Sequence, residues 1–403
     1  MDDSANEHIR FLARLGAAMA AANYPVTLVR QMLQRASGSY GIRTDFLALP
    51  NHVQVVGTGR GTGAAVASAN QGGDLRFDQT FPLARLVSDA MAARVSPAVG
   101  ETTLDRILAM RRPYPAWVTV TGYGIFSGGL SLVMEPTALN FLTAAVLGLL
   151  VGLLRLLGER VPGLDPLTPV VSALMVSALC IAGARYLGLD HVGLRALIPP
   201  LAAFLPGVAI TLSVVELTAR DVVSGASRLI AGFMQMAQLA FGILIATQIP
   251  GLRDAELSSE AINKLGWWAP WVGVVVYAVG VMLFLAPPLS FLPWLLVVAY
   301  VAYTAQFVGD VVLGGYASGF VGALALTICA LAISRRRHAP PAVSMILPGF
   351  WLLVPGSLGL IGVTEMFGAG GNSALPATLI AMISVAMGLQ VGLVLWRLAR
   401  PRR

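Results

Sequence analysis

Long apolar runs fill the chain from about residue 114 to its C-terminal end. A helix needs about 20 apolar residues to cross the hydrocarbon core of a bilayer, because that core is about 30 Å thick and the helix rises about 1.5 Å per residue. The pattern predicts ten such helices, over residues 114–134, 136–157, 166–187, 194–217, 226–249, 267–286, 288–307, 311–333, 341–365 and 376–397. We therefore expect a polytopic α-helical membrane protein.

The residues before the first apolar run have a different pattern. Apolar positions recur at helical spacing over residues 6–36, 82–95 and 101–112. A break at Asn23-Tyr24-Pro25 divides the first stretch into two helices. Residues 43–59 and the run that starts at Leu75 alternate apolar and polar side chains, which predicts a small antiparallel sheet. The order of elements predicts a soluble α+β domain over residues 1–112.

A thirteen-residue segment of the apolar region occurs twice. LPGVAITLSVVEL (Leu205 to Leu217) returns as VPGSLGLIGVTEM (Val354 to Met366), an offset of 149 since 354 − 205 = 149. The two cysteines, Cys180 and Cys329, follow the same offset. Adding 149 to the first five predicted spans brings each within a few residues of one of the last five. The pattern predicts two five-helix repeats, over residues 113–250 and 251–403.

The number of helices in each repeat determines the relative orientation of the repeats. With five helices, the second repeat enters the membrane from the opposite side to the first, so we expect an inverted repeat. Two inverted halves that exchange conformations would give alternating access to one central site.

Composition and charge agree with this division. A hydrophobic share of 56% with only 12% charged residues excludes a soluble globule for the chain as a whole. The start, MDDSANEHIRF, is acidic and lacks the features of a signal peptide, so we expect the first domain to stay in the cytoplasm.

Basic residues in the predicted loops set the orientation of the spans. The predicted cytoplasmic side receives Arg111, Arg112, Arg155, Arg160, Arg220, Arg228, Arg335, Arg336, Arg337, Arg397, Arg400, Arg402 and Arg403. The other side receives only Arg185, Arg195, Arg253 and Lys264. This bias predicts a membrane protein with both termini in the cytoplasm. It also explains the net charge of +7 without a nucleic-acid partner.

Each repeat carries a Pro-Gly pair inside an apolar span. Proline lacks an amide hydrogen and clashes with the preceding turn, so Pro206-Gly207 and Pro355-Gly356 should break their helices. A break at membrane depth needs protein or a water-filled cavity to satisfy the freed backbone groups, and a polar substrate could bind there. The alternative is a kink that serves packing only.

An acidic residue follows each pair by ten positions. Glu216 and Glu365 are candidate proton or amine partners, because a carboxylate inside a membrane costs free energy unless it is protonated or paired. The alternative for Glu216 is an interfacial residue beside Arg220 and Asp221. Asp310 could bind a cation or an amine, or could instead cap the start of the eighth span.

Three of the uncharged polar residues within the predicted spans are further candidates. Asn140, Thr211 and Gln235 could line a substrate pathway, although such groups also join helices by hydrogen bonds. The GTGRGTG run over residues 57–63 is similar to a dinucleotide fingerprint but has no βαβ unit around it, so a hairpin loop is the favoured interpretation. Neither the four histidines nor the two cysteines have metal-ligand spacing, and no nucleophile signature is present. We expect no cofactor, no metal and no enzymatic activity.

The order of modules resembles the threonine/serine exporter family of bacteria and fungi. The resemblance is carried by FLARLGAAMAAANYPVTLVRQMLQRASGSYGI, YPAWVTVTGYGIFSGGL, FLPGVAITLSVVEL and LLVPGSLGLIGVTEM. It implies an inner-membrane exporter of threonine and serine, driven by the proton motive force, with protons and membrane lipid as partners. It carries over no binding residue, and it leaves a homo-oligomer open.

Other functions stay open beside this resemblance. The chain could export another small metabolite such as a dicarboxylate, because some members of the family do so. It could be a membrane-anchored module whose N-terminal domain carries the activity, or a passive channel.

Overall fold

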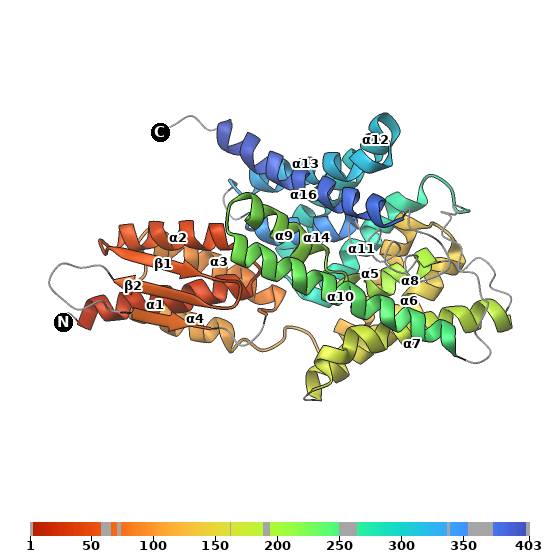
Figure 1. Cartoon of the computed structure of the whole chain (residues 1–403), viewed down its shortest axis with the longest axis horizontal. Helices are drawn as coiled ribbons and strands as arrows, with labels where there is room; N and C mark the ends of the chain where they lie inside the picture. Colours follow the sequence, from red (N-terminus) through yellow and green to blue (C-terminus); the bar gives the residue numbers. More distant parts are fainter. Residues whose placement is uncertain are drawn as a thin grey trace. The chain divides into compact units, whose positions relative to one another are not determined.

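A computed structural model of the chain describes residues 3–57, 66–70, 74–161, 163–187, 194–249, 264–336, 339–353 and 374–399. Most of these residues are helical, and the strands all lie near the N-terminus (Figure 1). The chain divides into two compact units. The first unit comprises residues 1–113 together with 212–228, and the second comprises residues 114–211 and 229–403. The predicted soluble domain over residues 1–112 thus shares its unit with a segment from the apolar region.

The N-terminal part of the first unit is an α+β structure. Its elements are α1 (Asp3–Ala21), α2 (Val26–Ser39), β1 (Thr44–Ala48), β2 (Val53–Gly57), β3 (Val66–Ala69), α3 (Phe77–Met91) and α4 (Pro97–Leu108). The antiparallel sheet has the order β1-β2-β3, with Phe46 opposite Val55 and Val55 opposite Ala67. Helices α1 and α2 pack on the sheet, and α4 packs on α1 (Figure 1).

Helix α1 forms the centre of this unit. Phe11, Leu12, Leu15 and Met19 are buried, as their helical spacing predicts. Gly16 makes room for the sheet, since a Cβ there would lie 2.8 Å from Cγ1 of Val53. A side chain at this glycine would push helix and sheet apart.

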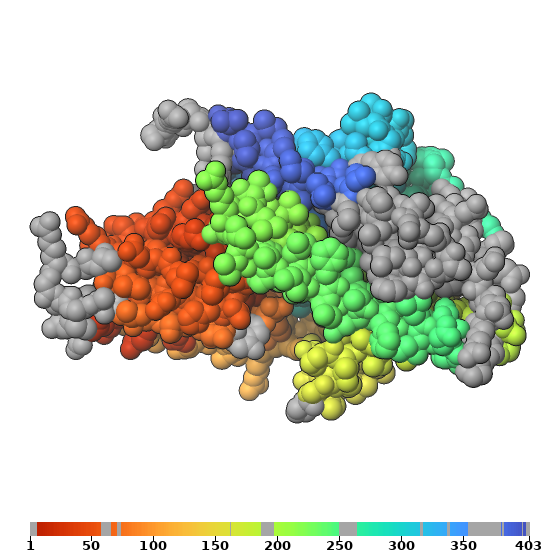
Figure 2. Space-filling model, viewed as in Figure 1, coloured from red at the N-terminus to blue at the C-terminus, as the bar shows by residue number. Residues whose placement is uncertain are grey.

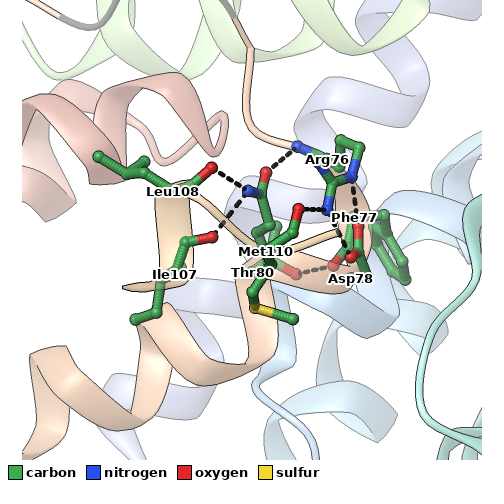
Figure 3. Close-up of polar contacts among 8 residues, drawn as sticks. Arg76, Phe77, Asp78, Thr80, Ile107, Leu108 and Met110 are labelled. Carbon is green, nitrogen blue, oxygen red and sulfur yellow. Dashed lines mark hydrogen bonds and ion pairs between the residues drawn. The ribbon is translucent and has the colours of Figure 1, made fainter. Parts of the chain in front are cut away.

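The predicted strand at Leu75 is wrong. The third strand is Val66–Ala69, and the run from Leu75 leads into α3 instead. The reason is a set of polar contacts at the start of α3 (Figure 3). The Arg76 guanidinium donates to the Met110 carbonyl at 2.8 Å, and Gln79 Nε2 donates to the carbonyls of Ile107 and Leu108. The bonds from Gln79 satisfy the last two carbonyl groups of α4, which have no partner within their own helix, and the bond from Arg76 reaches a carbonyl just after it.

The remaining elements are helical. They are α5 (Ala116–Met134), α6 (Ala138–Arg160), η1 (Asp165–Leu167), α7 (Thr168–Leu187), α8 (Leu194–Leu201), η2 (Ala202–Phe204), α9 (Gly207–Thr218), α10 (Val222–Gln248), α11 (Ala269–Leu285), η3 (Leu289–Phe291), α12 (Leu292–Leu313), α13 (Gly315–Ile333), α14 (Ala342–Leu353) and α16 (Ala374–Leu398). Helices α9 and α10 supply residues 212–228 to the first unit.

Five described helices are long and apolar enough to cross a membrane, and a sixth span results if the bent pair around residue 205 is counted as one. Four further apolar helices are shorter, over Ala269–Leu285, Ala317–Ile333, Ala342–Leu353 and Ile383–Trp396. A membrane region of several helices is therefore present. The number of ten spans and their arrangement as two repeats stay predictions.

Helices α5 and α11 pack closely against each other in the second unit. A Cβ at Gly129 would overlap the backbone of Tyr277, and a Cβ at Gly280 would overlap the backbone of Phe126. Glycine at these positions lets the two backbones touch, as is typical of helix pairs in membranes.

Two buried tyrosines of this pair make matching hydrogen bonds. Tyr123 on α5 donates its hydroxyl to the carbonyl of Pro200 on α8 at 2.8 Å. Tyr277 on α11 donates to the carbonyl of Pro348 on α14 at 2.6 Å. The partners are separated by similar offsets, since 277 − 123 = 154 and 348 − 200 = 148. Each tyrosine thus ties one of the two central helices to a proline-containing helix.

Candidate functional site

The chain bends where the first Pro-Gly pair lies. The segments Leu197–Phe204 and Gly207–Thr218 meet at 51°. Leu205 donates its N–H to Ala202, which closes η2, and the Pro206 carbonyl then accepts from Ile210 in the first turn of α9. Pro206 and Gly207 are both buried. The predicted break is present at this pair, whereas Pro355, Gly356 and Glu365 lie outside the described residues.

Helix α10 packs closely beside the break. A Cβ at Gly232 would lie 2.7 Å from Cγ1 of Ile210 and 3.5 Å from Cβ of Pro206. Ile210 and Met236 are buried together at the same place. The backbone of α10 therefore supports the first turn of α9 directly after the break.

An arginine lies beside η2. The Arg155 guanidinium carbon, on α6, is 5.1 Å from the ring centroid of Phe204, 5.4 Å from that of Phe284 and 5.9 Å from that of Tyr123. At such distances the negative faces of the rings attract the cation. Arg155 lies within α6, which continues to Arg160, and its place on the cytoplasmic side stays a prediction.

The position of Arg155 on α6 could have been recognised from its spacing. The exposed stripe of α6 consists of Leu142, Val146, Leu149, Leu153 and Leu157. Arg155 lies two residues from Leu153 and from Leu157, a rotation of about 200° in each direction. It extends the opposite stripe, in which Ala144, Gly148 and Val151 are buried. An arginine on the packed stripe of an apolar helix is the signal that a count of loop charges misses.

A neutral polar group lies beside Leu353 in the second half of the chain. Gln306 on α12 donates its Nε2 to the carbonyl of Leu353 at 3.4 Å, and Leu353 is 149 positions after Phe204. Gln306 is itself 151 positions after Arg155. A cation therefore lies beside the end of η2, and an amide lies beside the end of α14.

Glu216 lies in a different environment, within the first unit. Its side chain is fully buried, and Oε1 accepts hydrogen bonds from the N–H of Val26 at 3.0 Å and from Nε of Arg228 at 3.2 Å. Val26 is the first residue of α2, where helix N–H groups lack partners and favour negative charge. Glu216 thus has a cation and a helix N-terminus as partners.

A second ion pair lies beside this one. Arg30 donates to Asp221 at 2.6 Å. In Figure 2 the green residues of the 212–228 segment lie directly against the red and orange N-terminal residues of the same unit. The expected neighbour Arg220 is exposed and has a left-handed φ of 67° in the turn between α9 and α10. The carboxylates of this turn therefore pair with Arg228 and Arg30.

The pairing in this cluster is incomplete. Glu216 Oε2, Asp221 Oδ2 and Arg228 Nη2 are buried and have no hydrogen-bond partner among the described residues. A buried ion pair contributes little net stability when some of its lone pairs and protons stay unsatisfied, yet losing one partner is costly. The contact between α2 and the turn is specific, and it is sensitive to charge.

The other candidate residues are dispersed. Asp310 is exposed in the last turn of α12, and its predicted role as the cap of the next helix is wrong, because α12 continues through Val311, Val312 and Leu313 and Gly314 is the cap of α13. Thr211 is buried on α9, one turn after the break, and Gln235 is half-buried on α10.

Asn140 lies in the first turn of α6. Its backbone N–H donates to Oγ1 of Thr137, and its Nδ2 donates to Oε2 of Glu135, both at 3.0 Å. This geometry is an N-cap, in which Thr137 satisfies a free helix N–H. Asn140 therefore organises the start of the helix.

Neither a metal site nor a disulfide is formed by the described part of the chain. No group of three or more His, Cys, Asp or Glu residues is placed to hold a metal ion there. Cys180 on α7 and Cys329 on α13 are free thiols. Of the GTGRGTG run, only Gly57 is described, and residues 58–65 connect the adjacent antiparallel strands β2 and β3.

Comparison with known proteins identifies the family. Residues 10–249 match the family model ThrE, described as "Putative threonine/serine exporter". Pheromone-regulated membrane protein 10 of Eremothecium gossypii is 23% identical over 95% of this chain and 55% of its own length. The same protein of Kluyveromyces lactis is 23% identical over 95% of this chain and 43% of its own length.

The chain spans about half the length of these curated relatives. No solved structure matches it. The family model covers more than half of the chain and includes the break at Pro206-Gly207. The chain therefore belongs to the threonine/serine exporter family.

Proposed function

We propose that this chain is a secondary transporter that exports small polar amino acids, threonine and serine, across the inner membrane. The main support is the bend at Pro206-Gly207, since a broken helix exposes backbone groups that can bind a polar substrate. Membership of an exporter family supports a transporter rather than an enzyme. We place both termini in the cytoplasm on the basis of the arginine bias.

We further propose that the two halves form an inverted repeat. The support is a set of contacts between α5 and α11. Positions of α5 have equivalent positions in α11, 154 residues later, and the contacts between the two helices match when equivalent positions are exchanged. A Cβ at Gly122 would touch Leu283, and a Cβ at Gly129 would touch Val276, where 276 − 122 and 283 − 129 both equal 154. The contact between Phe126 and Gly280 pairs two positions with the same offset. This pattern is expected where a pseudo-twofold axis passes between two helices.

The same symmetry suggests a mechanism. Tyr123 ties α5 to α8, the half-helix before the first break, and Tyr277 ties α11 to α14, which ends directly before the second Pro-Gly pair. A rocking of α5 against α11 would therefore move both half-helices together. Alternating access then requires only that the halves exchange conformations.

Protons are the proposed coupling ion, and the two glutamates are proposed to differ in role. Glu216 already has a guanidinium and a helix N–H as partners, so we propose that it positions α2 against the turn after α9. Glu365, which has no basic residue near it in the sequence, is the better candidate for carrying a proton.

The proposal is tested with the purified chain in proteoliposomes. Counterflow of labelled L-threonine is measured with L-serine, L-alanine, succinate and malate as competitors. We expect saturable counterflow that serine inhibits and that succinate leaves unchanged. Inhibition by dicarboxylates alone would reassign the substrate, and flux that does not saturate would indicate a channel. A complete absence of flux would contradict the proposal and favour the alternative in which the N-terminal domain carries the activity.

A further inference from the structure

We propose that Arg155 binds the carboxylate of the transported substrate. This inference rests on the proposed function and deepens it, because it names one binding residue and the chemical group which that residue recognises. It is supported by three independent observations, concerning the position of Arg155 on α6, its surroundings and the neutral polar group beside Leu353 in the second half of the chain.

The position of Arg155 argues against a side chain that only reaches the lipid headgroups. A long basic side chain near the end of a spanning helix usually extends along the apolar face to reach the headgroups. Arg155 instead lies opposite the exposed stripe of α6, and its guanidinium lies over the rings of Phe204 and Phe284. The cation faces α5, α11 and η2, and η2 leads into the break.

The described residues around Arg155 hold the guanidinium in place without a hydrogen bond to it. Rings contact it from three elements, α5, η2 and α11, and the hydroxyl of Tyr123 is fixed by Pro200. Ring faces attract the charge but accept no conventional hydrogen bond, so these three rings leave the N–H donors of the fork unused. Among the described residues, no carboxylate forms an ion pair with Arg155. The side chain is half-buried, so a ligand can still reach it.

A planar guanidinium of this kind suits a carboxylate. The two can form parallel N–H···O bonds, and the charge of arginine does not depend on pH in the physiological range. The low polarity of the aromatic surroundings strengthens this pairing relative to water.

The polar residue beside Leu353 in the second half is neutral. Gln306 donates its amide to the Leu353 carbonyl, and Leu353 is 149 positions after Phe204. Arg335 and Arg336 follow α13, outside its apolar run. One cation and one neutral polar group favour a small amino acid over a dicarboxylate, which would need a second cation.

The test compares ligands with and without a carboxylate in the full-length chain. Wild type, Arg155→Gln and Arg155→Lys are reconstituted, with Arg160→Gln as the matched control, because Arg160 is an exposed arginine at the end of the same helix. Labelled L-threonine counterflow gives KM and kcat, and L-threonine and L-threoninol, which lacks the carboxylate, serve as competitors.

We expect Arg155→Gln to raise the KM for threonine by about 10-fold to 100-fold, since a hydrogen bond to a charged group contributes about 1.5–3 kcal/mol. Arg155→Lys should keep part of the affinity, and Arg160→Gln should stay within about twofold of wild type. Threoninol should compete poorly with threonine in wild type, and in Arg155→Gln the two should compete about equally.

An unchanged KM in Arg155→Gln would overturn the inference and leave the proposed function standing. If wild type carries only dicarboxylates, the assignment of an amino-acid substrate is wrong, and so is the inference that the ligand has a single carboxylate. If Arg155→Gln does not fold, protection of wild type from the arginine reagent phenylglyoxal replaces it. Threonine should protect a site that is absent in Arg155→Lys, and protection that is equal in both would contradict the assignment.

Discussion

The buried carboxylate of Glu216 accepts a hydrogen bond from the backbone N–H of Val26, 190 positions earlier in the chain. Arg228 completes the contact, and Arg30 pairs with Asp221 beside it. The N-terminal α+β structure is thus fastened to the turn between α9 and α10 through charged groups. Helix α9 has this contact near its last turn and the Pro-Gly break at its first residue. A change at either end can therefore affect the whole helix.

Glu216→Gln should destabilise the chain without changing the pH dependence of transport. Glutamine can still accept from Val26 but loses the charge that Arg228 needs, and breaking a buried ion pair costs about 3–5 kcal/mol. The expected result is a lower melting temperature in detergent and a lower transport rate with an unaltered pH profile. If the pH profile shifts instead, Glu216 carries protons and its assignment as a positioning residue is wrong.

Gly129→Ala should disrupt the pairing of α5 with α11. The added Cβ would overlap the backbone of Tyr277, which cannot move aside as a flexible side chain could. Overpacking of this kind costs about 1–3 kcal/mol or more. Gly38→Ala is the matched control, because a Cβ on that helical glycine meets nothing within 4 Å. Thermal unfolding of both variants in detergent should show a loss only for Gly129→Ala, and equal stability of the two would contradict the close helix crossing.

Tyr24 should make the stability of the first unit depend on pH in the alkaline range. Burial raises the pKa of Tyr24 from 10.0 to about 12. A folded-state pKa above the unfolded value means that the stabilisation is fully present below pH 10 and is lost as the pH rises through 12. A shift of this size corresponds to about 3 kcal/mol.

The comparison of wild type with Tyr24→Phe tests this dependence. Unfolding between pH 9 and pH 12, followed by the absorbance of tyrosinate, should show a steeper loss of stability for wild type. Parallel curves would mean that Tyr24 ionises as readily in the folded protein as in the unfolded chain.

Local chemistry allowed parts of this structure to be predicted from the sequence. The spacing of Phe11, Leu15 and Met19 predicted the buried face of α1, and the missing amide hydrogen of Pro206 predicted the break before α9. In both cases the cause lies within a few residues. The outcome therefore depends little on the rest of the fold.

Features that depend on distant partners could not be predicted in the same way. The segment at Leu75 alternates like a strand, but the contacts of Arg76 and Gln79 with the end of α4 bring it into a helix start. The side to which Arg155 points becomes apparent only when α5, η2 and α11 are placed around it. The partner of Glu216 on α2 is separated from it by most of the first repeat.

Secondary active transport is the central claim, and the uptake of labelled L-threonine into proteoliposomes against its own gradient tests it most directly. Export coupled to entering protons corresponds, in reverse, to uptake coupled to leaving protons. We therefore expect an acidic lumen to drive threonine accumulation, and a protonophore to abolish it. Uptake that only equilibrates, with or without the pH gradient, would contradict the claim.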